Sequence, residues 1–340
     1  MTINKISLSV ILYLASCASF AADTSPSSSE SSFHHQAEIG FLDTSESSDG
    51  LASATYSYFF QGVDQTDVPL ELAPYLSQSS VVSARYATTD HQDLYALSGE
   101  YIFDSRFFIG GAYSLVTQER EWFDSSDEDT YEINAGYYFN PYAKVTLSYL
   151  TYSHSNTYSN SNHAWYDSYN SQSSEDYDAI AAKYEHYLPF EKTSGLMLTA
   201  LVTYAEIKSK SHSAYTTYTV NGTDDLIPQM IESSNKGKHE ETTLIIDADW
   251  YITNAWSVGA SYKYLNYDSK STFSYSSQSP EGFISDTSGY ISDDSFNVYT
   301  VNTSYFWKFS KYISARASIE QLFIDSDSDT SFGIAINARF

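Results

Sequence analysis

The sequence has little positive charge, almost no cysteine and no apolar run of membrane-helix length, and each absence excludes a class of protein. Lys and Arg number 17 against 43 Asp and Glu, which gives a formal net charge of −26. A protein that binds nucleic acid needs clustered Lys and Arg to neutralise phosphates, so no nucleic-acid partner is expected. With a single cysteine, the chain can form no intrachain disulfide.

An apolar stretch near the N-terminus is too short to cross a bilayer as a helix. It covers 6–14 after Lys5, and small residues follow up to Ala21. A spanning helix needs about 20 apolar residues, whereas this pattern is typical of an export signal cleaved between Ala21 and Ala22. We predict a signal peptide over 1–21 and no transmembrane helix in the mature chain.

Aromatic residues are abundant, and they accompany a strict alternation of apolar and polar side chains. The chain contains 32 Tyr, and aromatics make up 16% of it, which excludes a disordered acidic protein. At the C-terminus, Phe332, Ile334 and Ile336 share one strand face, while Asn337 and Arg339 share the other. This period of two predicts a strand with one apolar and one polar face.

Similar alternating segments recur after a Ser-rich lead-in over 22–35, which we expect to be flexible. We count fourteen, although ambiguous edges also allow 12 or 16. Their spans are 36–43, 51–60, 79–88, 94–103, 106–117, 130–139, 144–154, 176–188, 196–207, 241–252, 256–267, 295–307, 312–323 and 330–340.

The length of these strands and the aromatics at their ends favour a membrane barrel over a soluble sandwich. Trp250, Trp256 and Trp307 flank short turns, as the aromatic girdles of an outer-membrane barrel do. We predict an all-β fold over 36–340, a transmembrane antiparallel up-and-down β-barrel of about 14 strands with both termini in the periplasm. Short periplasmic turns would then alternate with longer extracellular loops, which we place at 118–129, 156–175, 208–240 and 268–294.

Cys17 leaves an alternative open for the leader. The stretch 14–17, Leu-Ala-Ser-Cys, also resembles the lipobox of bacterial lipoproteins, in which the cysteine is acylated. We favour the ordinary signal peptide, which discards Cys17, because a barrel closed by its own strands needs no lipid to reach the membrane.

One segment, 61–78, is too long for the short turn expected at its place. Asp67 could cap a brief helix with Pro69 in its first turn, which would place Leu70 and Leu76 on one side. We expect a packed periplasmic excursion rather than a pore plug.

The two ends of the chain carry a family resemblance. A set of short stretches resembles the general bacterial porins, which are outer-membrane proteins of Gram-negative bacteria: 58–60 (Tyr-Phe-Phe), 68–70 (Val-Pro-Leu) with Ala73 and Leu76, and Val81 and Val82 with Tyr86. The resemblance implies passive diffusion of solutes through the outer membrane, and a homotrimer is an assembly found among such porins. Phe340 looks like the C-terminal signal that the barrel assembly machinery recognises.

The polar strand faces supply candidates for the pore lining. They carry charges of both signs, which are tolerated only where water hydrates them. Outside the strands, dense carboxylates such as those over 119–129 and 286–294, and Asp325, Asp327 and Asp329, predict a mild preference for cations. The pore-lining candidates are Glu38, Arg85, Glu100, Glu132, Lys144, Lys183, Glu185, Asp247, Asp249, Lys263, Arg316, Glu320 and Arg339.

No catalytic or metal-binding motif accompanies this pattern. None of the eight histidines has a convincing spacing to a nucleophile or to paired carboxylates, and no phosphate loop or dinucleotide fingerprint is present. We therefore expect no enzyme, cofactor or metal, and predict a water-filled channel for small hydrophilic solutes or cations, embedded among outer-membrane lipid and lipopolysaccharide. The alternative is a non-conducting surface barrel that acts as an adhesin or structural protein.

Overall fold

The structure, a computed structural model, describes residues 32–44, 50–120, 123–163, 166–220, 226–279, 282–324 and 327–340. These residues form fourteen strands and a short helix, α2 (Ala73–Ser77). The strands are β1 (Ser32–Thr44), β2 (Leu51–Asp64), β3 (Val81–Thr88), β4 (Gln92–Ile102), β5 (Phe107–Arg120), β6 (Phe123–Asn140), β7 (Ala143–His163), β8 (Tyr166–Leu188), β9 (Gly195–Val220), β10 (Leu226–Thr253), β11 (Trp256–Ser279), β12 (Gly282–Lys308), β13 (Ile313–Ile324) and β14 (Asp327–Arg339).

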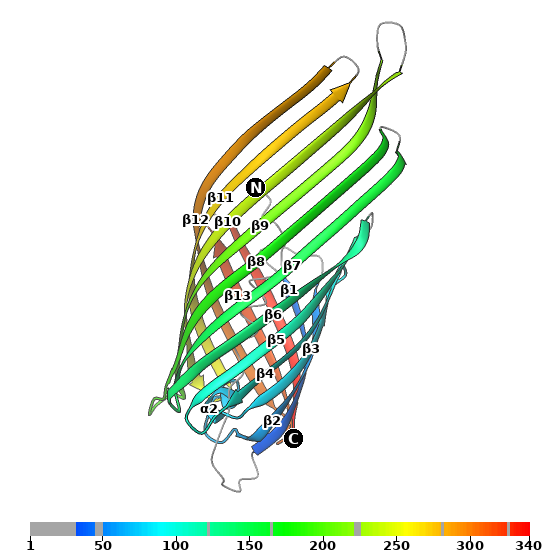
Figure 1. Cartoon of the computed structure of the whole chain (residues 1–340). Coiled ribbons are helices and arrows are strands. Elements are labelled where there is room, and N and C mark those ends of the chain that lie inside the picture. Colours follow the sequence, from blue (N-terminus) through cyan, green and yellow to red (C-terminus); the bar gives the residue numbers. More distant parts are fainter. Residues whose placement is uncertain are drawn as a thin grey trace.

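The sheet closes on itself. Each strand pairs with its neighbours in the sequence, and β14 pairs antiparallel with β1, from Gln36 opposite Arg339 to Thr44 opposite Ser331. Phe340 continues this pairing, since its N–H donates to the carbonyl of His35 (2.9 Å). Figure 1 shows the resulting up-and-down barrel. The predicted fold class and strand number are confirmed.

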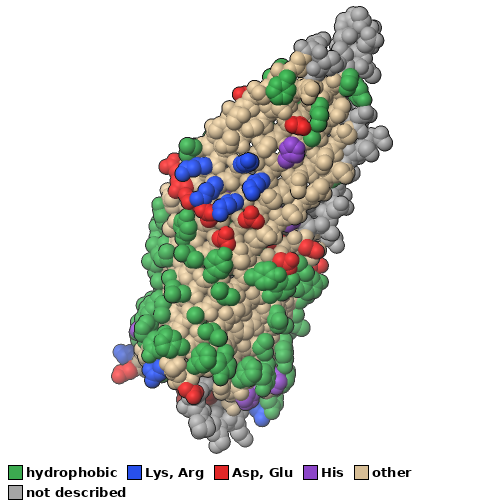
Figure 2. All heavy atoms as spheres, in the orientation of Figure 1, with side chains coloured by type: hydrophobic (Ala, Val, Ile, Leu, Met, Phe, Trp, Pro, Cys, Tyr) green, Lys and Arg blue, Asp and Glu red, His purple; other side chains and the backbone are tan. Residues whose placement is uncertain are grey.

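The two faces of each strand meet different surroundings, as the alternation predicted. On β14, Ile334 and Ile336 are 50% and 61% exposed on the outside, whereas Asn337 and Arg339 point inward and are 0% and 5% exposed. Figure 2 shows apolar side chains spread across the lower part of the visible face of the barrel. A lipid-facing band of this kind, with a polar interior, is the arrangement of outer-membrane barrels.

The predicted long loops are largely strand, which corrects the loop assignment. Strands β8 to β12 contain between 23 and 28 residues each, although about 9–11 residues suffice to cross a membrane. Their upper parts continue the ladder as a tall wall on one side of the barrel (Figure 1). Since alternating Ser, Thr and Tyr pair across strands as readily as apolar residues do, these stretches need no membrane to remain strands.

Acidic residues that were predicted to lie in loops also belong to strands, and some strand boundaries differ from the predicted ones. Asp127 and Asp129 lie in β6 and β14 begins at Asp327, while Asp325 lies outside the described residues. Strand β1 begins at Ser32, so the last four residues of the predicted lead-in belong to the barrel. The predicted signal peptide, its cleavage site and Cys17 also lie outside the described residues and stay predictions.

Among the described residues, no helix has the length and apolar character needed to cross a membrane.

Phe108 packs inside the barrel against the backbone of the next strand, and a glycine makes this contact possible. A Cβ placed on Gly136 would lie 2.3 Å from the Phe108 ring and 2.1 Å from the carbonyl oxygen of Val145. Phe108 itself is 1% exposed. Because Gly136 has no side chain, the Phe108 ring of β5 can pack directly against the backbone of β6.

We expect Gly136→Ala to lower the free energy of unfolding by about 1–3 kcal/mol, because the added methyl group overpacks this contact. Urea unfolding of the protein refolded into lipid vesicles measures the change. Gly289→Ala is the matched control, since the nearest atom to its added Cβ is 3.9 Å away. Equal stability of the two variants would contradict the packing argument.

Candidate functional site

The candidate site is the barrel lumen. All thirteen charged residues predicted to line it lie on the inward faces of their strands, which alternate with the exposed apolar residues outside. That these residues act on a permeating solute stays a prediction. They are Glu38 on β1, Arg85 on β3, Glu100 on β4, Glu132 on β6, Lys144 on β7, Lys183 and Glu185 on β8, Asp247 and Asp249 on β10, Lys263 on β11, Arg316 and Glu320 on β13, and Arg339 on β14.

A first group of these charges forms a buried ion-pair cluster on β7 and β8. Glu185 accepts from Lys183 (2.8 Å) and lies 3.5 Å from Lys144. Lys144 also lies over the rings of Phe108 and Tyr138, with its Nζ 5.3 and 5.6 Å from their centroids. Lys144 and Glu185 are only 5% and 3% exposed, so this cluster is more a packed part of the wall than a hydrated pore lining.

A second group of charged residues lies near the seam where β1 pairs with β14, which is far from β7 and β8 in the closed order of strands. Arg316 donates to Glu38 (3.3 Å) and to Glu71 (3.3 Å), and both carboxylates remain partly accessible. Arg339 lies over the Phe33 ring, 5.1 Å from its centroid, and donates to Gln65 (3.4 Å). Two of these partners, Glu71 and Gln65, come from the connection between β2 and β3.

That connection, 65–80, folds into the end of the lumen where the short turns and Phe340 lie, which is the end predicted to be periplasmic. Leu72 and Tyr75 pack with Tyr138, Tyr187 and other inward side chains in one apolar cluster. Figure 1 shows α2 within the lower end of the barrel. The expectation of an excursion outside the pore is therefore wrong: the inward faces of the strands carry large aromatics here, and these supply an apolar surface that the segment covers.

The predicted helix start within this segment is also wrong. Helix α2 begins at Ala73 with Pro74 in its first turn, and Leu72 at its N-cap makes no side-chain capping bond. Asp67 lies further upstream with a positive φ of 55°. It therefore marks a turn of the backbone and does not cap the helix.

Hydrogen bonds tie the segment to distant strands and turns. The Leu70 N–H donates to the Asn254 carbonyl in the β10–β11 turn (2.8 Å). The Tyr75 hydroxyl donates to the Tyr142 carbonyl in the β6–β7 turn (2.9 Å), and burial raises the pKa of this hydroxyl well above its ordinary value. Glu71 accepts from Tyr251 on β10 (3.4 Å). The segment thus spans the mouth of the barrel from β2 and β3 to the far wall.

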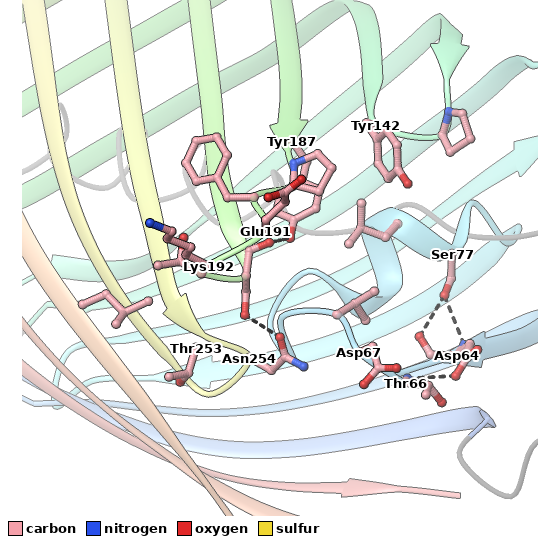
Figure 3. A pocket seen from close by; sticks show the side chains of 18 residues that line it. Asp64, Thr66, Asp67, Ser77, Tyr142, Tyr187, Glu191, Lys192, Thr253 and Asn254 are labelled. Carbon is pink, nitrogen blue, oxygen red and sulfur yellow. Dashed lines mark hydrogen bonds between the residues drawn. The ribbon is translucent and has the colours of Figure 1, made fainter.

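A cavity of about 670 Å³ remains between the segment and the periplasmic turns. Asp64, Thr66 and Ser77 line one side, and Ser194 and Asn254 line the other (Figure 3). Ser77 accepts from the backbone N–H of Asp64 (3.1 Å), and Ser194 donates to Asn254 (2.5 Å). Its lining combines these hydrogen-bonding groups with apolar side chains such as Val68, Leu76 and Phe190.

Strand β10 contributes two lumen carboxylates, Asp247 and Asp249, that are not members of the two ion-pair clusters. Asp249 accepts weakly from Asn302 (3.5 Å), and neither Asp247 nor Asp249 forms an ion pair within the part of the chain that the structure describes. Glu100, Glu132 and Glu320 also form no ion pair among the described residues. The sequence analysis predicted Asp247 and Asp249 as lumen residues but missed Glu71 and Tyr75. A local sequence pattern does not indicate that a connection between two strands enters the lumen.

Within the described ranges, no group of three or more His, Cys, Asp or Glu is arranged to hold a metal ion.

Comparisons with known proteins agree with the geometry. The family model described as "putative general bacterial porin" matches residues 3–283, whereas no curated protein matches the chain. Among solved structures, the outer membrane protein Omp33 of Acinetobacter baumannii is similar, with 14% identity and a TM-score of 0.50 over 92% of this chain and 100% of that one.

Two further solved structures are more distant. The ferric yersiniabactin uptake receptor FyuA from Yersinia pestis has 11% identity and a TM-score of 0.43 over 88% of this chain and 47% of that one. OmpT, an outer membrane protein of Vibrio cholerae, has 10% identity and a TM-score of 0.40 over 92% and 99%. The family match covers most of the chain and agrees with the closed fourteen-strand barrel. The chain therefore belongs to the general bacterial porins, which are channel proteins of the Gram-negative outer membrane.

Proposed function

We propose that the protein is a diffusion channel for small hydrophilic solutes with a mild preference for cations, narrowed at its periplasmic end by the segment 65–80. The observation that carries this proposal is the lumen itself: charged and polar side chains from strands all around the barrel face it, and such groups are stable there when they are hydrated or paired with one another. Passive permeation through such a lumen needs only weak interactions with the lining.

The preference for cations rests on lumen carboxylates that form no ion pair among the described residues. Asp247 and Asp249 face the lumen without an ion pair among the described residues. The wall above the membrane adds Asp286, Asp293 and Asp294 on β12. Carboxylates raise the local concentration of cations and repel anions, so permeation should favour cations.

The second candidate is a barrel that does not conduct, which serves at the surface as an adhesin or structural protein. The segment 65–80 favours it, because this segment crosses the periplasmic mouth and is anchored on both sides. The tall wall of β7 to β12 would then be the functional surface. A homotrimer, which the family resemblance implies, stays a prediction under either candidate.

Planar-bilayer conductance separates the two candidates. We expect the whole protein to form ohmic channels, and we expect a variant with 67–76 replaced by a short Gly/Ser linker to conduct about twofold more or better, because the obstruction is gone. Phe309→Ala, in the exposed β12–β13 turn, is the control and should conduct like the unaltered protein.

Conductance in the linker variant alone would favour the non-conducting barrel. Absence of conductance in both the unaltered protein and the linker variant would contradict a channel altogether, provided that heat-modifiable migration on a gel shows each of them to be folded.

The reversal potential in a salt gradient tests the charge argument. We expect the double variant Asp247→Asn with Asp249→Asn to lower the cation-to-anion permeability ratio a few-fold, since a charge at about 4 Å in water contributes about 1 kcal/mol. Asp104→Asn, in the β4–β5 turn, should leave the ratio unchanged. Anion preference of the unaltered protein, or an equal effect of both changes, would show that these carboxylates do not face permeating ions.

We also propose that the Phe340 side chain is the signal read by the barrel assembly machinery. Its backbone pairs with His35, and its ring stacks on the His35 ring at 5.1 Å while remaining 55% exposed. The backbone bonds close the barrel whatever the side chain is, so the exposed ring is available for recognition.

Phe340→Ala should lower the amount of protein in the outer membrane of cells and leave refolding of the urea-denatured chain into detergent unchanged. Phe309→Ala removes an even more exposed aromatic at the same end of the barrel and serves as the control. A parallel loss of refolding would assign Phe340 to stability instead of recognition.

A further inference from the structure

Five lysines gather on the outside of the barrel just above the apolar band. They lie at alternate positions on three neighbouring strands, and Figure 2 shows them as one blue cluster with carboxylates below. All five are exposed. The cluster, here called the lysine patch, consists of Lys208 and Lys210 on β9, Lys236 and Lys238 on β10, and Lys270 on β11.

The strand register stacks the charges in rows. In the lowest row, Asp178, Glu206, Glu240 and Asp268 lie opposite one another along β8 to β11. In the next row, Asp176 lies opposite Lys208, Lys208 opposite Lys238, and Lys238 opposite Lys270. In the row above, Lys210 lies opposite Lys236. Negative charge therefore borders the membrane, and positive charge lies directly outside it.

The lower lysines are largely neutralised within the protein. Lys208 binds Glu206 (2.5 Å), and Lys238 binds both Glu206 (2.6 Å) and Glu240 (2.9 Å). These carboxylates raise the pKa of Lys238 above its ordinary value. Asp176, Asp178, Asp268 and, on β12, Asp293 also lie on this surface.

The remaining three lysines have no such partner. Lys210, Lys236 and Lys270 have no carboxylate within 4.0 Å among the described residues. Like charges that lie directly opposite on neighbouring strands destabilise a sheet, and the pair Lys210 and Lys236 is in that position. An anion bound between them would remove this repulsion.

The height of the patch identifies where that anion lies. On β10 the outward residues run from Trp250 through Ile246 to Thr242 and then reach Lys238. At roughly 3.4 Å per residue and a tilt of roughly 40°, Trp250 to Thr242 covers roughly 20 Å of the membrane normal, and Trp250 to Lys238 covers roughly 30 Å. The apolar band of such barrels is about 25 Å tall, so the lysines lie at the headgroup level of the outer leaflet.

Elsewhere around the barrel, the upper edge of the apolar band carries tyrosines paired with carboxylates. The Tyr86 hydroxyl donates to Asp93 (2.7 Å), Tyr113 donates to Asp129, and Tyr149 donates to Asp178 (2.5 Å). Around β3 to β8 the rim therefore presents carboxylates to the headgroups, which repel phosphate. Only β9 to β11 present amines within the described part of the rim, so the surface is polarised around the barrel.

We propose that the lysine patch binds the phosphate groups of lipopolysaccharide, the anionic glycolipid of the outer leaflet. Lysine amines are compact donors that suit phosphate oxygens, and basic clusters beside a membrane recognise phosphorylated headgroups in this way. The lower pair of lysines and their glutamates hold the site in place, while Lys210, Lys236 and Lys270 contact the phosphates. The lipid then binds along one side of the barrel, beneath the tall wall.

The test compares lipid binding by the full-length protein in detergent, measured by native mass spectrometry and by thermal stabilisation. The variant K210Q/K236Q/K270Q removes the three lysines without a carboxylate partner. The matched control is K192Q/K308Q/K311Q, which removes three exposed lysines at the periplasmic end of the barrel. Both variants should keep the heat-modifiable migration of the unaltered protein, and K210Q/K236Q/K270Q should also keep its channel conductance, since these three lysines lie on the outside of the barrel.

We expect the unaltered protein to bind bisphosphorylated lipid A, and K210Q/K236Q/K270Q to bind it about tenfold more weakly or worse, because each amine near a charged membrane surface contributes measurably to anionic lipid binding. The control should bind it unchanged, and lipid A stripped of phosphate should bind the unaltered protein as weakly as the lysine variant binds the intact lipid.

Three results would overturn the proposal. One is equal binding by the two variants, and another is equal binding of phosphorylated and dephosphorylated lipid A. The third is equally tight binding of phosphatidylglycerol or inorganic phosphate, which would assign the patch to phospholipid headgroups or to free anions instead of lipopolysaccharide.

Discussion

In the hydrocarbon core of a membrane, water cannot satisfy the N–H and C=O groups of a backbone, and every other feature of this protein depends on that constraint. A sheet meets it only when it has no edge. Here the last strand pairs with the first along nine registered positions, and Phe340 extends the same ladder by bonding to His35. The alternation of side chains, the strand tilt and the girdles all follow from a sheet that must close within lipid.

Closure leaves an interior that has to be filled or hydrated, and this protein does both at different heights. Near the periplasmic end, Tyr138, Tyr187 and Tyr251 turn large rings inward, and the segment 65–80 covers them with Leu72 and Tyr75. The carboxylates Asp247 and Asp249 on β10 face the lumen without an ion pair among the described residues. The two ion-pair clusters contact the filled region, since Lys144 lies over the Tyr138 ring and Arg316 binds Glu71 of the segment.

Outside the membrane the same sheet continues without lipid to constrain it. In the wall formed by the upper parts of β7 to β12, Ser, Thr and Tyr pairs continue the same strand pairing. The sheet therefore keeps its geometry where its surroundings change from lipid to water. At that boundary the outward positions are free to carry charge. Tyrosine hydroxyls that donate to carboxylates mark it on one side of the barrel, and the lysine patch marks it on the other.

The sequence by itself determined the strand number, the closure and which side chains face outward or inward. The alternation with a period of two is a local property, and lipid and water each stabilise one of the two strand faces. Phe332 to Arg339 illustrates this, since each side chain lies on the face that its polarity predicted. Tertiary structure decided the rest. Asn156 to Glu175 looked like a loop, since polar residues do not reveal a strand until a neighbour pairs with them. Glu71 and Tyr75 gained their places only because closure brought β6, β8, β10 and β13 around them. The lysine patch likewise exists only through register, which places residues from three strands side by side.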